Sequence, residues 1–169
     1  VTGVQTCALP ISYWREPLRW NREAAAAGER RRVFCASLAD VGEERPDLVA
    51  PRARLAQLIL DTPNLDWLLL TKRIENMARL FPRDALERSW VGTTTENQEH
   101  ADKRIPILLQ TPAAVRFISA EPLLGPVDLT ELPSHYDGES RPLLRLDADR
   151  KSTRLNSSHT DISRMPSSA

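Results

Sequence analysis

Four short apolar runs, rich in β-branched and aromatic residues, recur along the chain at spacings that constrain its fold. They are Val33–Leu38, Trp67–Thr71, Trp90–Thr94 and Val115–Ser119. Successive runs lie about 24 to 34 residues apart, as right-handed βαβ crossovers require. The runs lack strict alternation of apolar and polar residues, which is typical of strands covered on both faces of a parallel sheet. The pattern therefore predicts an α/β fold.

Helical patterns fill the first two intervals between these runs. In the first interval Pro51 stands at a favoured first-turn position and Thr62-Pro63 ends the helix. Its apolar stripe comprises Leu55, Leu58 and Ile59. The stripe of the second interval comprises Ile74, Met77, Ala78 and Phe81.

The third interval and the N-terminal region also predict helices. Thr95 and Gln98 match a capping box, and Pro106 is expected to break or kink the helix that follows. Residues 14–32 predict a helix before the first strand. Four parallel strands in the order βαβαβαβ make either half a barrel or an open sheet with unpaired edges. We expect a partial parallel (β/α) barrel of four βα units, truncated at both ends.

The two ends of the chain are related in a way that has no reason at the protein level. When Asp149–His159 is read backwards and set beside Val1–Ile11, the two segments can be compared position by position. At all eleven positions the two residues can be encoded by codons that are complementary to each other. The implied DNA resembles a common sequencing adapter, and Ser163–Ala169 continues it. We expect residues 1–11 and 149–169 to be translated adapter that does not pack on the core, with residues 12–148 as the partial barrel domain. A genuine Ser-rich tail is the alternative.

The composition of residues 12–148 excludes several classes of protein. Of the 23 basic and 23 acidic residues in the chain, four and two lie in the end segments, which leaves 19 against 21. This balance gives no strong signal for nucleic acid or an anionic membrane. Residues 12–148 contain one cysteine, Cys35, so an internal disulfide framework is excluded. A single cysteine fits a reducing cytoplasm. No apolar run reaches the roughly 18 residues of a membrane span.

Polar residues follow every predicted strand, where the carboxyl ends of parallel strands line binding sites. They are Ser37 and Asp40, then Thr71, Lys72 and Arg73, then Thr93, Thr94, Thr95, Glu96 and Asn97, and finally Ser119 and Glu121. Two cations at the start of a helix oppose its dipole, which slightly favours a bound anion over a solvated turn at Lys72 and Arg73. Asp40 also has a simpler reading, as a residue that ends a strand.

Glu121 is the candidate catalytic residue, because Pro122 forces an extended backbone at Glu121 and fixes its direction. A plain turn carboxylate is the alternative. The candidate cofactor-binding residues are Ser37, Lys72, Arg73, Thr94, Glu96 and Asn97. Thr95 is interpreted as a helix cap, Cys35 as a core residue, and His100 and His135 as surface residues. No metal ligands are predicted.

At these strand ends the segments RVFCASLADV, LDWLLLTKRIENM and residues 90–129 resemble a phage and prophage protein family of unknown function, named for phage gene products thirty-seven and sixty-eight. That family is similar to radical S-adenosylmethionine proteins. The resemblance implies a partial barrel that, in the parent protein, binds S-adenosylmethionine and an iron–sulfur cluster through three cysteines. A cluster needs at least three thiolates, so we expect neither cofactor in this chain as given.

Three hypotheses about function follow. The chain is a piece of a radical-S-adenosylmethionine-like enzyme of unknown substrate, inactive as given. Alternatively, it is a non-catalytic module in which Lys72, Arg73 and Glu96 bind a nucleotide, another small molecule or a phage or host protein partner. The third hypothesis is a broken reading frame with no function. The enzyme hypothesis rests on resemblance alone.

Overall fold

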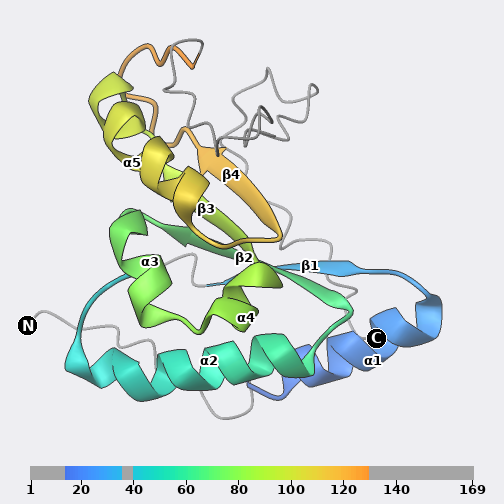
Figure 1. The fold of residues 1–169 in the computed structure, drawn as a ribbon. Helices are drawn as coiled ribbons and strands as arrows, with labels where there is room; N and C mark the ends of the chain where they lie inside the picture. The colour runs from blue at the N-terminus through green and yellow to red at the C-terminus, as the bar shows by residue number, and fades with distance from the viewer. Residues whose placement is uncertain (1–13, 36–39, 130–169) are drawn as a thin grey trace, which may run out of the picture.

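The computed structural model describes residues 14–35 and 40–129, which form a mixed α/β fold around a four-stranded parallel sheet (Figure 1). Its strands are β1 (Arg31–Cys35), β2 (Leu65–Thr71), β3 (Trp90–Thr94) and β4 (Val115–Ser119). Every neighbouring pair is parallel, and the order in the sheet is β1-β2-β3-β4. The bounds of β3 and β4 match the prediction, whereas β1 and β2 each begin two residues earlier.

The helices alternate with the strands, as the sequence predicts. They are α1 (Glu16–Ala27), α2 (Val49–Asp61), α3 (Ile74–Leu80), α4 (Arg83–Glu87) and α5 (Gln98–Gln110), with the short 3-10 helix η1 (Pro46–Leu48) before α2. Helix α1 ends at Gly28, whose φ of +66° is the left-handed conformation that glycine adopts without strain.

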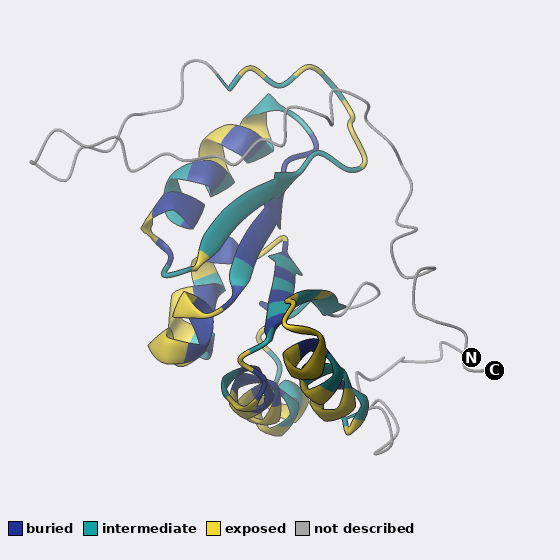
Figure 2. Cartoon of the chain, turned by 90° about the vertical axis from the view of Figure 1, so that its right-hand side faces the viewer, coloured by how far each residue is buried: buried dark blue, intermediate teal, exposed yellow. Residues whose placement is uncertain are grey.

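The helices lie together on one side of the sheet (Figures 1 and 2). This follows from the strand order, because right-handed crossovers between successive neighbouring strands all pass over the same face. In β2 the side chains of Leu65, Trp67 and Leu69 face the helices and are buried. Leu68 and Leu70 point to the other face and are only half-buried. The expectation that both faces are covered is therefore met only in part: one face of β2 is half-buried, whereas in β3 residues 91–94 are buried on both faces.

The core lies between the sheet and its helices. Its fully buried members include Leu69 and Val91 from the sheet and Met77 and Leu108 from α3 and α5. Trp67 brings a polar N–H into this core, where Nε1 donates to Thr62 Oγ1 at 2.9 Å. Because its N–H has this acceptor, the indole is buried without an unsatisfied donor.

Several local predictions are wrong. Ala78 is exposed, and the short helix α4 has no counterpart in the predicted pattern. Helix α5 continues through Pro106 to Gln110, so the break is wrong, while the kink stays a prediction. Its N-cap is Asn97, whose side chain accepts a hydrogen bond from the His100 backbone N–H at 3.0 Å. Thr95 is not the cap: it is fully buried, and its hydroxyl has no hydrogen-bond partner within the part of the chain that the structure describes.

After β4 the chain turns back across α5. Val127 and Leu129 pack against α5 residues Ala101, Ile105 and Leu109. Gln98 binds the backbone of Asp128 through both amide atoms, at 2.6 and 3.1 Å. Residues 120–129 are therefore anchored to the start of α5. Among the described helices, none is long and apolar enough to cross a membrane.

Candidate functional site

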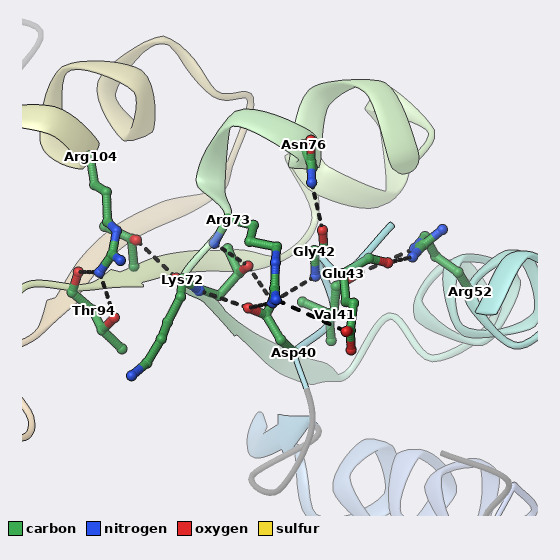
Figure 3. A network of polar contacts seen from close by, with 12 residues as sticks. Asp40, Val41, Gly42, Glu43, Arg52, Lys72, Arg73, Asn76, Thr94 and Arg104 are labelled. Atoms are coloured by element: carbon green, nitrogen blue, oxygen red, sulfur yellow. Dashed lines mark hydrogen bonds and ion pairs between the residues drawn. The ribbon is translucent and has the colours of Figure 1, made fainter. Parts of the chain in front are cut away.

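The carboxyl ends of β2 and β3 and the segment that begins at Asp40 carry a connected set of charged and polar side chains. Figure 3 shows the part of this set around Asp40, together with Thr94 and Arg104. We call this set the rim; it comprises Asp40, Thr71, Lys72, Arg73, Thr94, Glu96, His100 and Arg104. Two carboxylates organise it, one from Asp40 and one from Glu96. Parallel strands place these ends at one edge of the sheet, which is why residues distant in sequence meet there.

Asp40 is surrounded by hydrogen-bond donors. Its Oδ1 accepts from the Thr71 hydroxyl and from the Gly42 N–H at 2.9 Å. Its Oδ2 accepts from the Lys72 N–H at 3.1 Å and from Arg73 Nη1 at 2.9 Å. Each oxygen thus has two donors, which leaves Asp40 little capacity to bind anything else. The carboxylate instead holds the turn after β2 in place.

The segment from Asp40 to Glu44 is clamped against this turn. Asn76 donates to the Gly42 carbonyl at 2.9 Å, and the buried Arg52 donates to the carbonyls of Val41 and Glu43 (Figure 3). Burial lowers the pKa of Arg52 from its usual value. Gly42 itself lies so close to β2 that an added Cβ would meet the Thr71 hydroxyl and stand 2.9 Å from the Arg73 carbonyl oxygen.

Glu96 organises the other half of the rim, and its side chain is only 6% exposed. Lys72 Nζ lies 3.0 Å from Oε1, Arg104 Nη1 donates to Oε2 at 2.7 Å, and the Thr94 hydroxyl donates to Oε1 at 3.1 Å. His100 Nδ1 is 3.3 Å from Oε2, within ion-pair distance but without the angles of a hydrogen bond. This buried carboxylate is therefore fully paired.

The ionisation of Glu96 reflects these partners. Burial by itself raises the pKa of Glu96, but the hydrogen bonds from Lys72, from its own backbone and from Thr94, with the charge of Arg104, lower the pKa from 4.5 to about 2. The stabilising contacts outweigh desolvation because they favour the ionised form. Glu96 is therefore a carboxylate at every physiological pH.

Lys72 joins the two halves, since its backbone N–H binds Asp40 and its ammonium group binds Glu96. The side chains of Lys72 and Arg73 remain 55% and 44% exposed. An ammonium has three donors and a guanidinium five, so both keep donors for a ligand. With its acceptors occupied and its donors exposed, the rim is suited to bind an anion.

The structure brings together four of the seven predicted site residues: Lys72, Arg73, Thr94 and Glu96. Asn97 is adjacent but caps α5 with its side-chain oxygen. Glu121 follows β4 at the same edge and is half-buried. Ser37 lies outside the described residues. The binding and catalytic roles of all seven remain predictions.

Sequence reasoning missed two members of the rim. The sequence predicts His100 as a surface residue and assigns no role to Arg104, yet both contact Glu96. They follow Glu96 by four and eight residues, so helical periodicity places all three on one side of α5 and the turn before it. That spacing was the available signal.

An iron–sulfur cluster does not fit these residues. The chain has two cysteines, fewer than the three thiolates that such a cluster requires. Cys35 is the one in the described residues, and it is packed against the core. Within residues 14–35 and 40–129, no group of three or more His, Cys, Asp or Glu side chains could hold a metal ion.

The fold and rim define an α/β protein whose parallel sheet runs in chain order and ends in a cation-rich rim. Residues 3–149 match the model of the family described as "Protein of unknown function (DUF5131)", and the chain belongs to this family. Among curated proteins and solved structures, nothing matches the chain. The match includes residues 3–11, which the sequence predicts to be translated adapter. The origin of both end segments, which lie outside the described residues, stays a prediction.

Proposed function

We propose that the chain is part of a cytoplasmic, phage- or prophage-type protein with a (β/α) barrel architecture, which binds a small anionic ligand at the rim. Lys72 and Arg73 contact the ligand directly. Asp40 and Glu96 hold the two cations in position. This proposal develops the binding-module hypothesis, with a small molecule rather than a protein as the ligand.

The strand order supports the barrel architecture. Doubly wound sheets bind ligands where the strand order reverses, and helices then cover both faces. In the described residues the order β1-β2-β3-β4 has no reversal, and the helices cover one face. A (β/α) barrel has this arrangement in each of its units, and its ligands bind at the carboxyl ends of the strands.

The proposal about the ligand depends on which charged groups of the rim are already paired within the chain. The two carboxylates have their oxygens occupied by donors from the chain itself, whereas Lys72 and Arg73 are exposed and retain unused N–H groups. A cationic ligand would have to displace the donors that already bind these carboxylates. An anion would instead accept charge-assisted hydrogen bonds from the unused N–H groups of Lys72 and Arg73.

Removing either cation should weaken anion binding. In Lys72→Met and Arg73→Met the long apolar stem is retained while the charge is lost, so we expect the dissociation constant for tripolyphosphate to rise about tenfold in each variant. Isothermal titration calorimetry at low ionic strength measures this. Arg83→Met, which removes an exposed arginine of α4 that pairs with Glu87, is the matched control.

Equal affinities in the wild type and in both rim variants would refute the anion site. A loss in Arg83→Met as large as in Lys72→Met would show that the binding reflects general surface charge, and would refute it as well. Added salt should weaken the wild-type complex, because the contacting cations are partly exposed.

A second candidate function is the radical-S-adenosylmethionine-like enzyme implied by the sequence resemblance. The position of Glu121 favours it, because this half-buried residue follows β4 at the edge of the sheet where the ligand would bind. The rim cations would contact the carboxylate of S-adenosylmethionine, and Glu121 its ammonium group. The iron–sulfur cluster would need thiolates from outside this chain.

Glu121→Gln tests this second candidate. We expect weaker binding of S-adenosylmethionine with little change in thermal stability, because surface substitutions usually alter the free energy of unfolding by no more than about 0.5 kcal/mol. Titration calorimetry and thermal denaturation measure the two effects. An unchanged dissociation constant would leave Glu121 as an ordinary turn carboxylate.

A further inference from the structure

We propose that the anion bound at the rim carries an apolar or aromatic body, which packs on Leu123 and Leu124. This inference rests on the proposed function and identifies the class of ligand: an amphipathic anion of nucleotide size rather than a free inorganic anion. Three observations lead to it: the exposure of the two leucines, their connection to the rim, and the anchoring of the segment that carries them.

Leu123 and Leu124 are unusual in their exposure. Within the described residues four large apolar side chains are exposed, and these are two of them, with exposed fractions of 43% and 70%. Single exposed apolar residues are common on protein surfaces and need no explanation. Leu123 and Leu124 are adjacent in sequence, so two exposed apolar side chains lie in one short segment, and covering either of them would remove apolar surface from water.

The leucines are joined to the rim through Glu96. The Leu124 N–H donates to the Glu96 carbonyl oxygen at 2.7 Å, and the Glu96 carboxylate lies 3.0 Å from Lys72 Nζ. Covalent geometry limits the carbonyl and carboxylate oxygens of one glutamate to a separation of about 7 Å, so the Leu124 nitrogen and the Lys72 ammonium lie within roughly 13 Å. One small ligand can contact both.

The segment that carries the leucines is anchored on both sides. Before it, β4 pairs with β3, and the Thr95 N–H donates to the Ser119 carbonyl at 2.9 Å. After it, Val127 packs on α5 and Gln98 binds the backbone of Asp128. Figure 2 shows this segment as an extended, largely exposed strip beyond the end of the sheet. Such anchoring limits the ordering entropy that a ligand must offset.

The test compares two ligands that share their charged group. Tripolyphosphate and ATP both present three linked phosphates, but only ATP adds an apolar aromatic body. In the wild type we expect ATP to bind about tenfold more tightly than tripolyphosphate. In the double variant Leu123→Ser/Leu124→Ser this difference should disappear, while the dissociation constant for tripolyphosphate stays unchanged. Leu18→Ser, an exposed leucine of α1, should keep the difference.

Each outcome decides the inference. Equal wild-type affinities for ATP and tripolyphosphate would overturn it and leave the proposed anion site intact. Retained discrimination in the double variant would also overturn it. Loss of tripolyphosphate binding in that variant would show that the leucines only maintain the structure; Leu124→Ala, with circular dichroism to verify folding, repeats the comparison with a smaller change. Binding of neither ligand by the wild type would refute the anion site together with the inference.

Discussion

Replacing Glu96 with Gln should lower the free energy of unfolding at pH 7 by about 3 kcal/mol, because a shift of one pKa unit corresponds to about 1.4 kcal/mol. The pKa of Glu96 falls from 4.5 to about 2 in the folded protein. Its carboxylate is 6% exposed and is paired with Lys72 and Arg104. The neutral amide keeps the shape of the side chain but leaves both cations without their partner.

The effect should depend on pH in a defined direction. Because the folded pKa is lower than the unfolded one, the stabilisation by Glu96 is complete above about pH 4.5 and is lost as the pH falls through about 2. Urea denaturation of the wild type and Glu96→Gln across this range measures the difference in unfolding free energy. The control is Glu99→Gln, an exposed glutamate in the first turn of α5.

A stability difference between wild type and Glu96→Gln that is the same at pH 7 and at pH 2 would contradict this account, because the charge of Glu96 would then contribute nothing. A loss of equal size in Glu99→Gln would contradict it too. The variant should also bind tripolyphosphate less tightly, since Lys72 is no longer held by its carboxylate.

Gly42→Ala should destabilise the rim by about 1 to 3 kcal/mol, the usual cost of forcing extra atoms into a packed site. The added Cβ would stand 2.9 Å from the Arg73 carbonyl oxygen, a backbone atom that cannot move without shifting the turn after β2. Arg73 would move with it. We therefore expect both a lower midpoint of thermal unfolding and weaker tripolyphosphate binding.

Gly125→Ala is the matched control, because a Cβ at Gly125 has nothing within 4 Å. It should leave the unfolding midpoint and anion affinity close to those of the wild type. Differential scanning calorimetry and titration calorimetry provide the two readings. If Gly42→Ala behaves like Gly125→Ala, the close packing of residues 40–44 on β2 is not required for the position of Arg73.

The strands were predictable because their information is local. Trp90–Thr94 and Val115–Ser119 are dense in β-branched and aromatic residues, and turn or capping signals bound them. Helix α2 was predictable for a similar reason, since its stripe of Leu55, Leu58 and Ile59 is buried as expected. Helix α4 has five residues, too few to show a helical period.

The rim was predictable only in part. Parallel strands bring their carboxyl ends to one edge, so Lys72, Arg73, Thr94 and Glu96 could be grouped in advance. Which of these residues contacts a ligand and which holds a cation in place could not be predicted. A carboxylate looks the same in sequence whether it contacts a ligand or holds a cation in place, and its partners decide which role is open to it.

The sequence by itself determined the alternation of strands and helices, the parallel direction of the strands and the edge at which polar residues gather, because these follow from local pattern and connection length. Only the tertiary structure decided that Glu96 is buried with both carboxylate oxygens paired, and that Asn97 rather than Thr95 caps α5. The same holds for the hydrogen bond from the Leu124 N–H to the Glu96 carbonyl oxygen. These features depend on contacts between segments 20 or more residues apart or on exact backbone geometry, and hydrophobic periodicity carries no information about either.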